Sequence, residues 1–310
     1  MNEPTIVAPD TSLPAEPASA ATATHSLYWS VRRELWENRS IYLVPLIVAA
    51  FVLFAALISL IGLPRRVRHV PPNDPVKQHA VMVAPYSVAS APIMVVAFLV
   101  GIFYSLDALH GERRDRSILF WKSLPVSDRT TVLSKAAIPL VVLPAISFVL
   151  GLTTQLVLMP ATSAVLLAHG VSPATLWSEF RFVQEPLVMI YGLLVHALWF
   201  APLFAWLLLV SAWARRTPIL WAALPPFAIL LLERIAFHSN RFALLLKYRM
   251  TGAMDEAFAL TPTQDTGVID RLTQLDPIRF VTAPGLWLGL LFAAGCLAAA
   301  VRLRRNREPI

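Results

Sequence analysis

The chain contains six apolar segments, each long enough to cross the hydrocarbon core of a lipid bilayer as a helix. A core about 30 Å thick needs roughly 20 apolar residues in a helix. Only 15% of the 310 residues are charged, against about 25% in soluble domains. The pattern therefore predicts an all-α integral membrane protein and excludes one large soluble core. The predicted spans are Tyr42–Leu63, Ser87–Leu109, Ala136–Pro160, Pro186–Trp213, Pro218–Ile235 and Pro284–Val301.

The net charge of +7 comes from basic residues that lie beside the apolar segments. Lys and Arg in such positions orient a membrane protein against anionic headgroups. We therefore expect contact with membrane lipid and no nucleic-acid partner. The single cysteine, Cys296, lies in an apolar run and has no second cysteine for a disulfide or a metal site. No metal site is expected.

The distribution of Lys and Arg also predicts the orientation of the chain. With the amino terminus inside, more than half of the 26 basic residues fall in inner segments, including Arg215, Arg216 and the basic carboxyl end. Six spans then place both termini in the cytoplasm. Residues 26–305 form the predicted membrane domain, with an outer loop at 236–283 that contains one or two short helices dipping toward the outer leaflet.

Two tails flank this domain. Residues 1–25 are rich in Ala, Pro, Thr and Ser, and no Lys or Arg precedes Arg32. This composition predicts a disordered cytoplasmic tail and no cleavable signal peptide. Residues 306–310 are predicted to form a second cytoplasmic tail.

The segment Ser26–Ser40 is predicted to be a helix at the membrane surface, with Ser26 as its N-cap. Trp29 and Trp36 suit the interface between lipid and water. An ordinary linker is the alternative interpretation. The predicted apolar face holds Tyr28, Val31 and Leu35, and the predicted charged face holds Arg33, Glu34 and Glu37.

Residues 110–135 join the second and third spans and combine basic residues with an apolar cluster that is too short to span. Pro125 ends the cluster, because the residue before a proline disfavours helix. Ser127 or Asp128 can cap the helix that follows. The short helix before Pro125 fits either a groove in another protein or the lipid surface, and the residues alone leave both open. Its apolar side chains are Ile118, Leu119, Phe120, Trp121 and Leu124.

The sequence GERRDRSILFWKSLPVSDRTTVLSK resembles the cytoplasmic loop of ABC-2-type transporter permeases. Glu112 matches an acidic residue of that loop, Ser117 matches a threonine, and Lys135 matches a downstream lysine. The run from Leu124 to Ser127 matches the proline-containing middle, and Arg116 stands where the family usually has glycine. The order of interfacial helix, six spans and outer insertion is also similar over residues 26–305.

This resemblance implies an ABC-2-type permease architecture in the bacterial inner (cytoplasmic) membrane. Two permease subunits, identical or different, would pair with two cytoplasmic ABC ATP-binding subunits, and the loop would carry a coupling helix for export. ATP and Mg²⁺ would bind the partner, so this chain would be no enzyme and hold no cofactor. None of its eleven glycines is followed by lysine, as a phosphate loop requires. The coupling residues would be Glu112, Ser117, Ile118, Leu119, Trp121, Leu124 and Pro125.

Two further residues are candidates for a substrate path. His196 lies within the fourth span, where an ionisable group is a functional candidate, although a packing role is an alternative. Glu233 ends the fifth span beside Arg234, where such a pair often marks the membrane edge. An ion-gradient-driven secondary transporter, which would need such buried groups and repeated halves, remains an alternative function. A polytopic membrane scaffold or intramembrane enzyme is another.

Overall fold

The computed structural model of the chain describes residues 20–69, 75–117, 126–170, 172–174, 177, 184–259 and 272–306. These residues are mainly helical, and their β contact is an isolated antiparallel bridge between Phe258 and Leu275. Six helices are long and apolar enough to cross a membrane, which confirms the prediction of a multi-pass all-α protein. They are Ser40–Val67, Ala91–Arg114, Asp128–Ala168, Pro186–Trp213, Pro218–Phe237 and Pro284–Asn306.

Several of the spans combine two or three helical segments. Their order along the chain is α1 (Ala20–Glu37), α2 (Ser40–Ser59), η1 (Leu60–Gly62), α3 (Leu63–His69), α4 (Pro75–Asp107), α5 (His110–Arg114), α7 (Asp128–Ala137), η2 (Ile138–Val142), α8 (Leu143–Ala168), α10 (Gln184–Trp213), α11 (Pro218–Phe237), α12 (Arg241–Ala257), η3 (Leu272–Gln274), α13 (Pro277–Thr282) and α14 (Pro284–Asn306).

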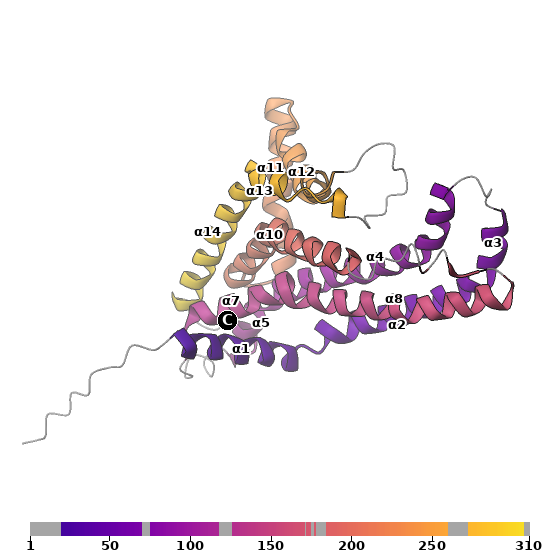
Figure 1. Cartoon of the computed structure of the whole chain (residues 1–310). Helices are drawn as coiled ribbons and strands as arrows, with labels where there is room; N and C mark the ends of the chain where they lie inside the picture. The colour runs from indigo at the N-terminus through magenta and orange to yellow at the C-terminus, as the bar shows by residue number, and fades with distance from the viewer. Residues whose placement is uncertain are drawn as a thin grey trace, which may run out of the picture.

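The long helices α2, α4 and α8 pack together along their lengths, and α10 packs against both α4 and α14 (Figure 1). No residue of α11 is buried, and this helix touches the bundle mainly through α10 and α12. At one end of the bundle, α1, α5, α7 and the last turns of α14 come together (Figure 1). We call this the charged end, because ionic side chains of these four helices meet there.

The third span is longer than predicted. The continuous helix Asp128–Ala168 has 41 residues, which is about 60 Å at 1.5 Å per residue and twice the thickness of a bilayer core. Part of it must therefore lie outside the hydrocarbon. One of its prolines, Pro139, lies in a π-helical turn, η2 (Ile138–Val142). Such a turn lets a long helix absorb a proline without ending.

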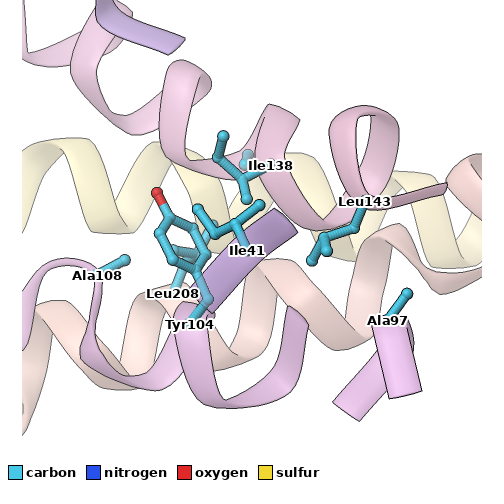
Figure 2. Close-up of a cluster of buried hydrophobic side chains, with 8 residues drawn as sticks. Ile41, Ala97, Tyr104, Ala108, Ile138, Leu143 and Leu208 are labelled. Atoms are coloured by element: carbon cyan, nitrogen blue, oxygen red, sulfur yellow. The ribbon is translucent and has the colours of Figure 1, made fainter. Parts of the chain in front are cut away.

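A buried apolar cluster lies next to the charged end, where α2, α4, α10 and the third span meet (Figure 2). Ile41, Ile138 and Leu208 have no exposed surface. Because lipid tails are as apolar as these side chains, their contribution is close packing and not removal from water. The cluster consists of Ile41, Ala97, Tyr104, Ala108, Ala136, Ile138, Leu143 and Leu208.

The segment between the fifth and sixth spans contains the predicted short helices, as α12 and α13. Their depth in the outer leaflet stays a prediction. Arg249 ties α12 to two spans: its Nη1 donates to the Gly285 carbonyl at 3.0 Å, and its guanidinium lies 4.7 Å from the Trp199 ring centroid. Trp199 Nε1 in turn donates to the Arg249 carbonyl at 2.8 Å.

We predict that Gly289→Ala loosens α12 from the bundle. A Cβ atom at Gly289 would overlap the Arg249 guanidinium, which must then leave its acceptor on Gly285. Loss of a charged hydrogen bond costs about 1.5 kcal/mol, or roughly ten-fold faster local opening. Hydrogen exchange of the α12 amides measures this. Gly295→Ala on the same helix is the control, because a Cβ there meets nothing within 4 Å. Equal exchange rates in the two variants would contradict the prediction.

Candidate functional site

The first helix differs from its prediction in the residue at which it begins and in the direction of a charged side chain. It begins at Ala20, six residues before the expected start, so the prediction that Ser26 is the N-cap is wrong. Glu34 of its predicted charged face packs inward with 0% exposed surface, whereas Glu37 of that face is exposed and Tyr28 is 60% exposed. Val31 and Leu35 of the predicted apolar face do pack against the buried cluster near Tyr104.

The charged end is built around a buried set of ionic side chains from four helices. Lys135 of α7 is at its centre, with its Nζ 2.9 Å from Glu34 Oε1 and 3.1 Å from Glu112 Oε1. Three carboxylates face three cations within this set, and Glu37 of α1 also pairs with Arg33 at 3.7 Å. We call this set the ion cluster; it consists of Arg33, Glu34, Glu112, Asp128, Lys135 and Arg304.

The outer members of the ion cluster connect the remaining helices to Lys135. Arg304, near the end of α14, bonds Glu112 Oε2 at 3.2 Å and also bonds Asp128 at the start of α7. Arg33 Nη2 donates to Glu34 Oε1 at 2.8 Å. The Tyr104 hydroxyl points out of the apolar cluster (Figure 2) and donates to Glu34 Oε2 at 2.7 Å. The cluster therefore joins α1, α5, α7 and α14, and the Tyr104 hydroxyl connects α4 to it.

The electrostatics of Glu34 follow from this arrangement. Burial raises the pKa of its carboxyl, but the charge of Lys135 and the hydrogen bonds from Arg33, Lys135 and Tyr104 outweigh burial, so the pKa lies below its ordinary value. Glu34 is thus ionised at neutral pH. Because both partners of such a pair have lost their hydration, removal of one leaves a buried charge without compensation.

The short helix α5 is fixed to α10 by reciprocal capping. The Ser211 hydroxyl of α10 accepts from the backbone nitrogens of Leu109 and His110 at 3.0 and 2.9 Å. Arg113 Nη1 of α5 donates to the carbonyls of Ala212 and Ala214 at 2.8 and 3.2 Å, at the end of α10. Free backbone groups at both helix ends are thereby satisfied.

The described residues on either side of the loop between the second and third spans have defined contacts. Ser117 Oγ donates to the Glu112 carbonyl at 3.4 Å, and Arg116 has a left-handed backbone with φ of 57°, a conformation that favours glycine. At the other end, Ser127 Oγ accepts from the Thr130 nitrogen at 3.1 Å, which confirms Ser127 as the cap of α7. The predicted coupling residues Ile118, Leu119, Trp121, Leu124 and Pro125 lie outside the described residues.

A polar cavity of about 590 Å³ opens beside the ion cluster. Glu112 and Lys135 line it together with Glu37, Asp107 and Ser117. Burial is the largest of several influences on Glu37, and it raises the pKa of this carboxyl above its ordinary value. The cavity thus borders the point at which the loop leaves α5.

The two candidate substrate-path residues, His196 and Glu233, lie in different surroundings. His196 is 8% exposed, and its ring centroid lies 5.0 Å from that of Phe200 and 5.9 Å from that of Phe98. Glu233 accepts from the backbone nitrogens of Arg241 and Phe242 at 2.7 and 2.8 Å, so it caps the first turn of α12. That either residue lines a substrate path stays a prediction.

Sequence reasoning brings neither Arg33, Glu34 nor Arg304 into the ion cluster, and it considers Asp128 only as a helix cap. It places Arg33 and Glu34 on the charged face of the first helix, and it treats Arg304 as one of several basic residues that follow the last span. A carboxylate on a membrane-proximal helix is the available signal for Glu34, but its partners Lys135 and Tyr104 lie 101 and 70 residues away. Arg304 is not distinguishable from its arginine neighbours by sequence.

Comparison with known proteins provides no family assignment, since no family model, curated protein or solved structure matches the chain. Within the described ranges, no grouping of His, Cys, Asp and Glu side chains could hold a metal ion. The ion cluster is a set of opposite charges that joins α1, α5, α7 and α14 at this end of the bundle.

We predict that Lys135→Met strongly destabilises the protein, because Glu34 and Glu112 then lose their shared cation. Breaking a buried pair costs about 3–5 kcal/mol. Thermal unfolding of the purified protein in detergent measures the effect. Lys247→Met, the same change at an exposed position of α12, is the control and should leave the unfolding temperature nearly unchanged. A similar small shift for both variants would contradict the account of the site.

We also predict a specific acid sensitivity. Since the pKa of Glu34 is lowered by folding from about 4.5, its contribution to stability is complete above that pH and is lost as the pH falls through the folded-state value. Unfolding temperatures measured from about pH 7 to pH 3.5 should therefore fall more steeply for the wild type than for Glu34→Gln. Parallel curves would show that Glu34 contributes no such linkage.

Proposed function

We propose that this chain is the membrane-spanning permease subunit of an ATP-binding-cassette exporter. The observation that carries the proposal is the ion cluster, which joins both flanks of the loop between the second and third spans to other helices of the bundle. Glu112 precedes the loop, and Asp128 and Lys135 follow it. Both loop ends therefore belong to one connected unit.

Such a unit suits a lever that a motor outside the membrane can push. A force on the loop would act on α5, which is capped by α10, and on α7, which continues into the third span. Arg304 would pass the displacement to the sixth span and Glu34 would pass it to α1. Because packed helices move as discrete bodies, the displacement would reach the spans and not be absorbed in the loop.

The energy source would be a separate cytoplasmic ABC ATP-binding subunit that carries ATP and Mg²⁺. The resemblance of residues 111–135 to the ABC-2 permease loop supports this class of partner, as does the lack of a glycine-lysine pair in the sequence. Two permease subunits, as a homodimer or heterodimer, would then act with two ATPase subunits. The charged end would face the cytoplasm of a bacterium, with both termini on that side.

Within the loop, we assign the apolar side chains of Leu119 and Trp121 to the groove of the ATPase, together with Ile118, Leu124 and Pro125. Glu112 and Ser117 would set the position of the coupling helix through their places beside the ion cluster. Arg116 supports this arrangement, because its left-handed backbone lies where the family usually has glycine.

We predict that Leu119→Asp combined with Trp121→Asp releases the ATPase. Each buried anchor in a protein interface contributes about 2 kcal/mol or more, so the double variant should lose nearly all copurified ATP hydrolysis. The tagged chain is purified from membranes of the cell that makes it, and vanadate-sensitive ATP hydrolysis is measured in the eluate.

The control is Leu244→Asp with Met254→Asp, two exposed positions of α12, which should keep the wild-type level. Undiminished ATP hydrolysis in the loop variant would remove the docking claim. No ATP hydrolysis with the wild type would favour the gradient-driven transporter or the scaffold.

A further inference from the structure

The exposed side of α1 carries three large aromatic side chains around one arginine. Tyr28, Trp29 and Trp36 are 60%, 54% and 65% exposed. At about 100° per residue, Trp29 and Trp36 lie within about 60° of Arg32 on the helix surface, and Glu34 lies on the opposite side. We call Tyr28, Trp29, Arg32 and Trp36 the aromatic face.

Arg32 is held by the two indoles and not by an acid. Its Cζ lies 5.0 Å from the Trp29 ring centroid and 4.8 Å from the Trp36 ring centroid. Among the described residues it has no carboxylate partner, in contrast to its neighbour Arg33, which pairs with Glu34. Stacking covers the faces of a guanidinium. It leaves the N–H donors, which point outward in the plane, for other acceptors.

The position of the aromatic face brings it close to the bilayer. Helix α1 ends at Glu37, and α2, the first span, begins at Ser40. Arg32 is therefore about two turns of helix from the start of the span. Indole rings favour the level of the lipid headgroups, and basic residues there are attracted to anionic headgroups.

We propose that the aromatic face binds the phosphate of an anionic phospholipid in the membrane that the chain crosses. The two indoles hold the guanidinium and lie among the headgroups, and Arg32 donates to the phosphate oxygens. The face carries no acid that would repel the lipid. This inference depends on the chain being a membrane protein and not on its proposed partnership with an ATPase.

Lipid binding on this face has a consequence for the ion cluster. The opposite side of the same helix turn carries Glu34, which bonds Lys135 and Tyr104. A bound headgroup therefore fixes the rotation of α1 about its axis and with it the position of Glu34. The lipid composition of the membrane would thus act on the joint between α1, α4 and α7.

The test uses the full chain in nanodiscs of phosphatidylcholine with a minor fraction of phosphatidylglycerol, one of the two brominated near the headgroup. Quenching of tryptophan fluorescence by each brominated lipid is compared at equal mole fraction. For the wild type we expect more quenching by brominated phosphatidylglycerol. Arg32→Gln should reduce the apparent preference about five-fold, and Arg32→Lys should reduce it less.

The matched control is Arg302→Gln, which removes the same charge from an exposed position near the charged end. It should keep the preference for phosphatidylglycerol. An undiminished preference in Arg32→Gln would overturn the proposal. An equal loss in Arg302→Gln would overturn it as well, because net charge and not the aromatic face would then attract the lipid. The preference should also fall as salt rises toward about 0.5 M, where surface charges are screened.

Discussion

The structure depends on a buried set of opposite charges at one end of a helical membrane bundle. Apolar helices in lipid have little preference for one neighbour over another, since tails and side chains are equally apolar. Ion pairs that are buried and hydrogen-bonded are specific, because any other arrangement leaves a charge without compensation. Lys135 therefore determines which helices meet at this end, through its bonds to Glu34 and Glu112. The apolar cluster beneath it then fixes how closely they pack.

The ion cluster joins helices near the two ends of the chain to residues near its middle. Helix α1 comes before the first span and α14 is the last, yet Glu34 contacts Lys135, which follows the central loop, and Arg304 contacts Glu112, which precedes it. A loop with fixed ends can transmit force, whereas a loop attached to one mobile helix cannot. The opposite end of the bundle is joined differently, by Arg249 and Glu233, whose bonds go mainly to backbone groups. The two ends thus differ in the type of interaction that holds them.

The elements that sequence predicts well are those with a local cause. The presence of six apolar spans, the serine cap at Ser127 and the helices between the fifth and sixth spans all follow from local sequence, although the third span is longer than predicted. The inward direction of Glu34 does not, because its partners Lys135 and Tyr104 lie on α7 and α4. The start of α1 at Ala20 is also not predicted. The left-handed backbone at Arg116 is not predicted from the sequence, although the resemblance places a glycine at this position in related loops. The apolar side chains of the loop remain a prediction from sequence alone.

The measurement that tests the account most directly is the side of the membrane on which the charged end lies. Asp115 is exposed there and outside the ion cluster, so Asp115→Cys, with Cys296 replaced by Ala, reports its accessibility to a membrane-impermeant thiol reagent. The account predicts modification in inverted membrane vesicles and none in intact cells. Modification only from outside intact cells would contradict it, because no cytoplasmic ATPase could then reach the loop.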